Sequence, residues 1–257
     1  VRSAQKAVFH YYLDSTKKDL KIEILDAQGK LVNTFIGELP KTKKENGEGE
    51  EDDEDRKPKP PTIKTGLNVF EWDLKYPSAS YFKGMIFWGA PVYTGPAALP
   101  GNYQVRITSG DQVVTENFEI KMDPRVKDIT MADMQEKFNL AIQIRDQVTV
   151  ANDAVIKIRS IKEKLNEQAK ASKKALSKSS ISLISAISKI EENLYQVRNQ
   201  SSQDPLNFPI KLNNKMASLM RVVESGDYKP TAGSYKVFEE LKAELAIEIN
   251  QLNKLWH

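Results

Sequence analysis

The amino-acid sequence predicts a β-then-α protein, in which an antiparallel β-sandwich of immunoglobulin or fibronectin type precedes an antiparallel bundle of about four helices. Before residue 123, apolar residues alternate with polar ones in several short segments. After residue 130, apolar residues recur at spacings of three and four. Asp123 and Pro124 separate the two patterns, because proline has no amide hydrogen for a β-ladder and restrains the residue before it. We therefore expect one domain over residues 1–123 and a second over residues 124–257.

Short strands separated by turns are expected throughout the first half. Asp26 and Gly29 supply the turn between two of the strands, and residues 109–111 supply another. Glu116 interrupts the alternation of the last strand, so we expect it near the edge of a sheet. About seven short strands are typical of an antiparallel sandwich. The expected strands are residues 7–13, 20–24, 31–36, 66–74, 85–88, 103–107 and 114–120.

Residues 41–61 do not fit a sandwich core. A run of acidic residues over 48–55 is followed by three prolines, and the segment holds no apolar residue that it could bury. We interpret it as a disordered, solvated loop. A calcium-binding loop is the alternative, but the regular alternation of ligands with a turn glycine is missing.

The region between residues 72 and 93 is the richest in aromatic residues, and glycines punctuate it. Flat rings can form a platform for a sugar or a protein, and they can equally fill a sandwich core. Alternation places Trp72 in the core. Trp88 and Tyr93 are candidate binding residues, with core packing or contact with another domain as the alternatives.

Four amphipathic segments are expected in the second half, over residues 130 to about 165, 183–197, 212–223 and 231–256. Thr130 and Thr231 are suited to cap the first and fourth helices, and Gly226 to follow the third. A first helix of about 35 residues would be about 50 Å long, so it needs other helices alongside. Four such segments joined by short loops predict an antiparallel bundle.

The polar loop over residues 199–209 is unusual. Asp204 and Asn207 are candidate binding residues, and the alternative is that Asp204 caps a neighbouring helix. Asn213 and Asn214 follow within the third helix, where asparagine is not favoured.

Several classes of function are not expected. The chain has no cysteine, and of its two histidines His10 lies in an expected strand and His257 at the last position, so we expect neither a three-histidine zinc site nor a Ser-His-Asp triad. No phosphate-binding glycine loop is present, and we expect no cofactor and no metal. A net charge of +3 gives no reason to expect a nucleic acid partner, and no apolar run is long enough for a transmembrane segment. The sequence does not exclude a pair of carboxylates for glycoside hydrolysis, because acidic residues are plentiful, so whether the chain is an enzyme is undecided.

Four stretches carry a resemblance to a known family. They are GLNVFEWDLKYP (66–77), GMIFWGAPVYTGPAALPGNYQVRI (84–107), KMDPRV (121–126) and YQVRNQSSQDPLNFPIKLNNKMASL (195–219). Together they resemble the C-terminal region of large exported proteins that begin with a propeller of sortilin-like or BNR-type repeats and are often labelled glycosyl hydrolases. The resemblance transfers no catalytic residue to this chain, since the propeller is not part of it.

The resemblance implies a location outside the cytoplasm: periplasmic, outer-membrane-associated or extracellular. The expected function is that of a non-catalytic accessory tail that packs on its own N-terminal propeller or on an envelope protein. A carbohydrate-binding module, with a glycan as partner, is one alternative. The other is part of a glycosyl hydrolase whose active site lies on the propeller.

Overall fold

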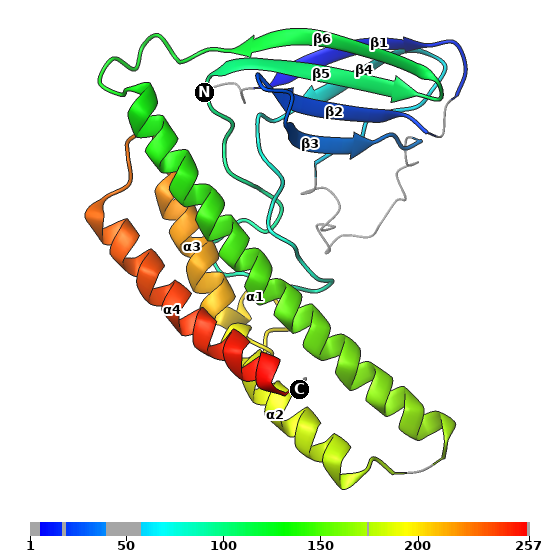
Figure 1. Ribbon diagram of the computed structural model, residues 1–257, viewed down its shortest axis with the longest axis vertical. Coiled ribbons are helices and arrows are strands. Elements are labelled where there is room, and N and C mark those ends of the chain that lie inside the picture. Colours follow the sequence, from blue (N-terminus) through cyan, green and yellow to red (C-terminus); the bar gives the residue numbers. More distant parts are fainter. Residues whose placement is uncertain (1–5, 17–18, 40–57, 174, 256–257) are drawn as a thin grey trace. The chain divides into compact units, whose positions relative to one another are not determined.

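A computed structural model describes residues 6–16, 19–39, 58–173 and 175–255. Within these ranges six strands precede four α-helices, so the predicted β-then-α order is confirmed (Figure 1). The chain divides into two compact units. Val1–Pro77 and Tyr93–Met131 form one, which we call the sheet unit, and Ser78–Val92 and Ala132–His257 form the other, which we call the helical unit.

The sheet unit contains two antiparallel sheets, one of two strands and one of four (Figure 1). The strands are β1 (Ala7–Leu13), β2 (Lys21–Asp26), β3 (Leu31–Ile36), β4 (Gly66–Trp72), β5 (Gly101–Ser109) and β6 (Gln112–Ile120). β1 pairs with β4, and the larger sheet has the order β3-β2-β5-β6. Glu116 therefore lies on an edge strand, as its break in the alternation predicted.

Both sheets contribute to one hydrophobic core. Trp72 of β4 is almost fully buried, and its ring centroid lies 6.0 Å from that of Tyr103 and 6.1 Å from that of Phe118. The prediction that Trp72 belongs to the core is thus confirmed. Aromatic pairs at this separation and at a steep angle add to the stabilisation that area burial gives.

The turn between β2 and β3 forms as its residues predicted. The Asp26 carboxylate accepts hydrogen bonds from the backbone amides of Gln28 at 3.0 Å and Lys30 at 2.9 Å. Gly29 has a φ of +76°, a left-handed conformation that glycine adopts without steric cost.

The helical unit contains α1 (Met131–Ala171), α2 (Lys178–Leu194), α3 (Leu212–Glu224), α4 (Ala232–Lys254) and a short 3-10 helix, η2 (Asp204–Leu206). The Thr231 hydroxyl accepts a hydrogen bond from the amide of Ser234 at 3.1 Å, so the predicted cap of α4 is confirmed. α1 begins directly after Thr130 and continues to Ala171, beyond the end expected near residue 165.

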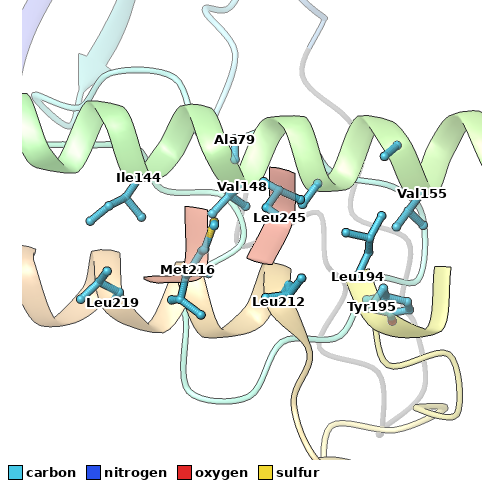
Figure 2. Packing of buried hydrophobic residues seen from close by; sticks show 14 of the residues in the cluster. Ala79, Ile144, Val148, Val155, Leu194, Tyr195, Leu212, Met216, Leu219 and Leu245 are labelled. Atoms are coloured by element: carbon cyan, nitrogen blue, oxygen red, sulfur yellow. The ribbon is translucent and has the colours of Figure 1, made fainter. Parts of the chain in front are cut away.

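Side chains from all four helices form the core of the helical unit. Figure 2 shows Ile144 and Val148 of α1 facing Leu219 and Met216 of α3, and Val155 of α1 facing Leu194 of α2. These apolar residues repeat at helical spacing, which is why the sequence pattern predicted the four helices.

Two sequence expectations differ from the fold. Residues 85–88 form no strand, and Met85 is buried in the core of the helical unit. The units consequently do not divide the chain at residue 123, since Ser78–Val92 belongs to the helical unit. The sequence predicts a disordered acidic loop, or alternatively a calcium-binding loop, over residues 41–61. Residues 41–57 of this segment lie outside the described residues.

Candidate functional site

The segment 78–92, which we call the strap, leaves the sheet unit after Pro77 and returns to it at Tyr93. Within the sheet unit its two ends are joined. The amide of Tyr76 donates to the carbonyl of Pro96 at 2.8 Å, and the amide of Ala98 donates to the carbonyl of Leu74 at 2.8 Å. The strap is therefore a closed loop rather than a loose connection between strands.

Gly95 lies at this closure. A Cβ atom built on Gly95 would overlap the carbonyl oxygens of Tyr76 and Pro77. The two chain ends can approach so closely because residue 95 has no side chain.

Apolar side chains anchor the strap in the core of the helical unit. Ala79 and Met85 are buried there, and Phe82 packs against the core with its ring perpendicular to that of Tyr195, 5.0 Å between centroids. The guanidinium of Arg159 lies 4.5 Å from the centre of the Phe82 ring, within the range of a cation-π interaction.

The first polar contact joins the strap to α1 at Ser80. Its carbonyl accepts a hydrogen bond from the fully buried Asn152 side chain at 2.6 Å. Its amide donates to the Thr149 hydroxyl at 3.3 Å. Asn152 Oδ1 in turn accepts from Asn213 Nδ2 at 2.9 Å, which links the contact to α3.

The second polar contact joins the strap to α3 at Trp88. The Trp88 amide donates to Asn214 Oδ1 at 2.7 Å, and Asn214 Nδ2 donates to the Trp88 carbonyl at 3.1 Å. A single side-chain amide thus pairs with both backbone groups of one residue, as a neighbouring β-strand would. Asn213 fixes this arrangement, because its Oδ1 accepts from the backbone amide of Asn214 at 2.8 Å.

The third polar contact joins the strap to Tyr195, directly after α2. The Tyr195 hydroxyl accepts a hydrogen bond from the amide of Ile86 at 3.1 Å and donates to the carbonyl of Gly84 at 3.5 Å. Burial raises the pKa of Tyr195, against the opposing effect of the Ile86 amide, so the hydroxyl keeps its proton at neutral pH.

An ion-pair cluster lies beside this contact. The buried Glu191 carboxylate accepts from Arg159 Nε at 2.7 Å and from Lys162 Nζ at 2.8 Å. Because Arg159 also covers the Phe82 ring, the cluster positions a residue that holds the strap.

The candidate residues from the aromatic region belong to different units. Trp88 belongs to the strap, and 41% of its surface is exposed although its backbone is held by Asn214. Tyr93 is half-buried in the sheet unit.

The candidate residues in the loop 199–209 have a local role. The Asp204 carboxylate accepts from the amides of Gln200 at 2.6 Å and Ser201 at 2.8 Å, and these hydrogen bonds lower the pKa of Asp204. Asn207 is exposed, and its amide donates to the carbonyl of Asp204 at 2.8 Å. Asp204 therefore organises the turn in which it lies, and it caps neither α2 nor α3.

Sequence reasoning missed Thr149, Asn152 and Tyr195 as residues that hold the strap. Asn152 carries a usable signal, because it is a polar residue between Val148 and Val155 on the apolar face of α1.

In the described part of the chain, no group of three or more His, Cys, Asp or Glu side chains is arranged to hold a metal ion. Among the described helices, none combines the length and the apolar character that crossing a membrane requires. Comparison with protein-family models, with curated proteins and with solved structures found no match for this chain.

Proposed function

We propose that this chain is a non-catalytic interaction module of an exported protein. In this proposal it packs against an N-terminal propeller of sortilin-like or BNR-type repeats, or against an envelope protein, in the periplasm, at the outer membrane or outside the cell. The sheet unit would be a sandwich of immunoglobulin type, supported by the core that both sheets share. The helical unit would be an antiparallel bundle, supported by the common core of its four helices.

The observation that carries the proposal is an exposed apolar face on the sheet of β1 and β4. The antiparallel register pairs Tyr12 with Leu67 and His10 with Val69, so alternate residues of both strands share one face. Tyr12 is 72% exposed and Leu67 is 62% exposed, and Val8 and Val69 on the same face are exposed as well. Contiguous exposed apolar side chains mark surfaces that dock other proteins or domains.

Oxidative footprinting of tyrosines tests this proposal. Tyr12 should be labelled readily in the isolated chain and protected in the intact natural protein, because a docked domain or partner would cover the β1–β4 face. Tyr228, which is 70% exposed on the helical unit, is the matched control and should be labelled equally in both.

A Leu67→Lys variant sharpens the test. It should abolish the protection of Tyr12 in the intact protein and leave the melting temperature of the isolated chain nearly unchanged, since Leu67 is already exposed. Equal labelling of Tyr12 in the isolated chain and the intact protein would refute docking at this face.

A second candidate function is carbohydrate binding, and the geometry of Trp88 favours it. The indole of Trp88 is exposed, and Asn214 holds both the amide and the carbonyl of the Trp88 backbone. The ring is therefore preorganised for stacking on a sugar. A glycan array would then show ligands for the wild-type chain that are lost in Trp88→Ala and kept in Tyr228→Ala. A blank array for the wild-type chain would remove this candidate.

A further inference from the structure

A pocket of about 320 Å³ lies in the helical unit, and no residue of the strap lines it. Its walls come from the end of α2, the start of α3 and the second half of α4. The volume is at the lower end of the range for small-molecule sites, which suits a ligand the size of an amino acid.

One wall of the pocket is acidic. Glu244 and Glu248 lie one helical turn apart on α4 and both line the pocket. Glu248 Oε1 accepts a hydrogen bond from Asn193 Nδ2 at 3.0 Å. Glu248 Oε2 is shielded from solvent and has no hydrogen-bond donor among the residues that the structure describes. The two carboxylates make this part of the lining negatively charged, which favours a cationic ligand group.

The start of α3 contributes basic side chains to the pocket lining. Lys211 and Lys215 line the pocket there, and Lys211 is the N-cap of that helix without a side-chain hydrogen bond to the free amides. The positive end of the helix dipole adds to the two ammonium charges. Across the described residues, no ion pair within 4.0 Å joins either lysine to Glu244 or Glu248.

Apolar side chains complete the lining. Leu212 and Ile247 line the pocket, and Ile247 is 57% exposed. The pocket therefore combines acidic side chains of α4, basic side chains from the start of α3 and one apolar side chain of each helix.

We propose that this pocket binds a basic α-amino acid, either free or as the C-terminal residue of a peptide. Its guanidinium or ammonium group meets the carboxylates of Glu244 and Glu248, its methylene chain lies on Leu212 and Ile247, and its carboxylate meets Lys211 and Lys215. The inference is independent of the docking function proposed above, which concerns the sheet unit.

Isothermal titration of the full chain with arginine, citrulline and agmatine tests the assignment. Citrulline has nearly the shape of arginine without its charge, and agmatine lacks the carboxylate, so each should bind at least about tenfold more weakly than arginine. The tripeptide Gly-Gly-Arg distinguishes a peptide C-terminus from a free amino acid. If neither arginine nor Gly-Gly-Arg binds saturably, the proposal is overturned.

Two variants and one control assign the binding to this pocket. Glu248→Gln should weaken the binding of arginine by about tenfold or more, because the side chain keeps its shape and loses its charge. Lys215→Gln should weaken arginine and leave agmatine unchanged. Glu240→Gln, on the same helix and outside the pocket, is the control that should bind as the wild type does. Unchanged arginine affinity in folded Glu248→Gln would also overturn the proposal.

Discussion

Asn214 holds the strap with a single side chain. It is 3% exposed, and its amide supplies the acceptor and the donor that the backbone of Trp88 requires. A segment without β-pairing would otherwise leave these two backbone groups without protein partners, which is costly away from water.

Substitutions at Asn214 should therefore destabilise the helical unit. We expect Asn214→Ala to lower the free energy of unfolding by about 2–4 kcal/mol, because Trp88 loses both partners and a small cavity is left. Asn214→Asp should lower it more at pH 7 than at pH 4, because an ionised carboxylate cannot donate to the Trp88 carbonyl. Urea denaturation measures both effects, with the exposed Asn250→Ala as control. A loss for Asn214→Ala as small as that of the control would contradict this role.

Glu23 makes the stability of the sheet unit depend on pH in the acidic range. Arg106 Nε donates to its carboxylate at 2.9 Å and Lys21 lies at 3.2 Å. The hydrogen bond from Arg106 is the main cause that lowers the pKa of Glu23 below its ordinary value of 4.5, against the opposing effect of burial. The pair therefore stabilises the fold above that ordinary value and ceases to do so as the pH falls through the lower, folded-state pKa.

Glu23→Gln should reduce the free energy of unfolding by about 1 kcal/mol at pH 7. The difference from the wild type should shrink as the pH falls below about 4.5, where the carboxylate of the unfolded chain takes up its proton, and should be lost once the pH has passed the lower pKa of the folded state. Glu71→Gln is the control, because its ion pair with Lys6 is half-exposed and should contribute little. A difference that stays constant down to pH 2 would contradict the assignment.

At the scale of elements, the strap depends on the closure at its base. The hydrogen bonds between residues 74–76 and 96–98 bring its ends together, and Gly95 allows the backbones to approach. An alanine at this position has to displace backbone atoms, which cannot move as a flexible side chain can.

We expect Gly95→Ala to destabilise the protein by about 3 kcal/mol or more. Gly233→Ala provides a matched control, because a Cβ on that glycine of α4 meets its nearest atom at an ordinary 3.5 Å. This control should be neutral or more stable by up to about 1 kcal/mol, since alanine favours a helix. Thermal unfolding followed by circular dichroism distinguishes the two, and equal melting temperatures would contradict the close approach at Gly95.

The elements were predictable from local patterns, whereas the strap was not. The four helices follow from apolar residues at spacings such as Ile144 and Val148, and Thr231 marks the start of α4. Residues 85–88 are a short apolar run among strands, and nothing in their own pattern distinguishes a strand from a segment buried against helices. Their environment depends on Asn214 and Tyr195, more than 100 residues later in the chain.

The candidate site was predictable only in part. The sequence directed attention to Trp88 and Asp204, and it also marked Asn213 and Asn214 as residues that a helix disfavours. The reason for those asparagines is a pairing with backbone atoms of another segment, which residue spacing does not reveal.

At the scale of the whole molecule, the chain passes between the two units three times, after Pro77, after Val92 and after Met131. A cut near residue 123 would separate α1–α4 from Ala79 and Met85, which belong to their core. The helical unit is therefore completed by residues that precede it in the chain, and the unit that folds is not a continuous stretch of sequence.

Hydrogen exchange of the full chain tests this claim most directly. The experiment uses a variant in which a glycine-serine segment of equal length replaces residues 78–92. Mass spectrometry compares its amide hydrogen exchange with that of the wild type. We predict that exchange in α1 over residues 140–158 and in α3 accelerates by about tenfold or more, because the strap's apolar anchors and its pairing with Asn214 are lost, while β2 and β5 keep their protection. Unchanged protection of α1 and α3 in this variant would contradict the account.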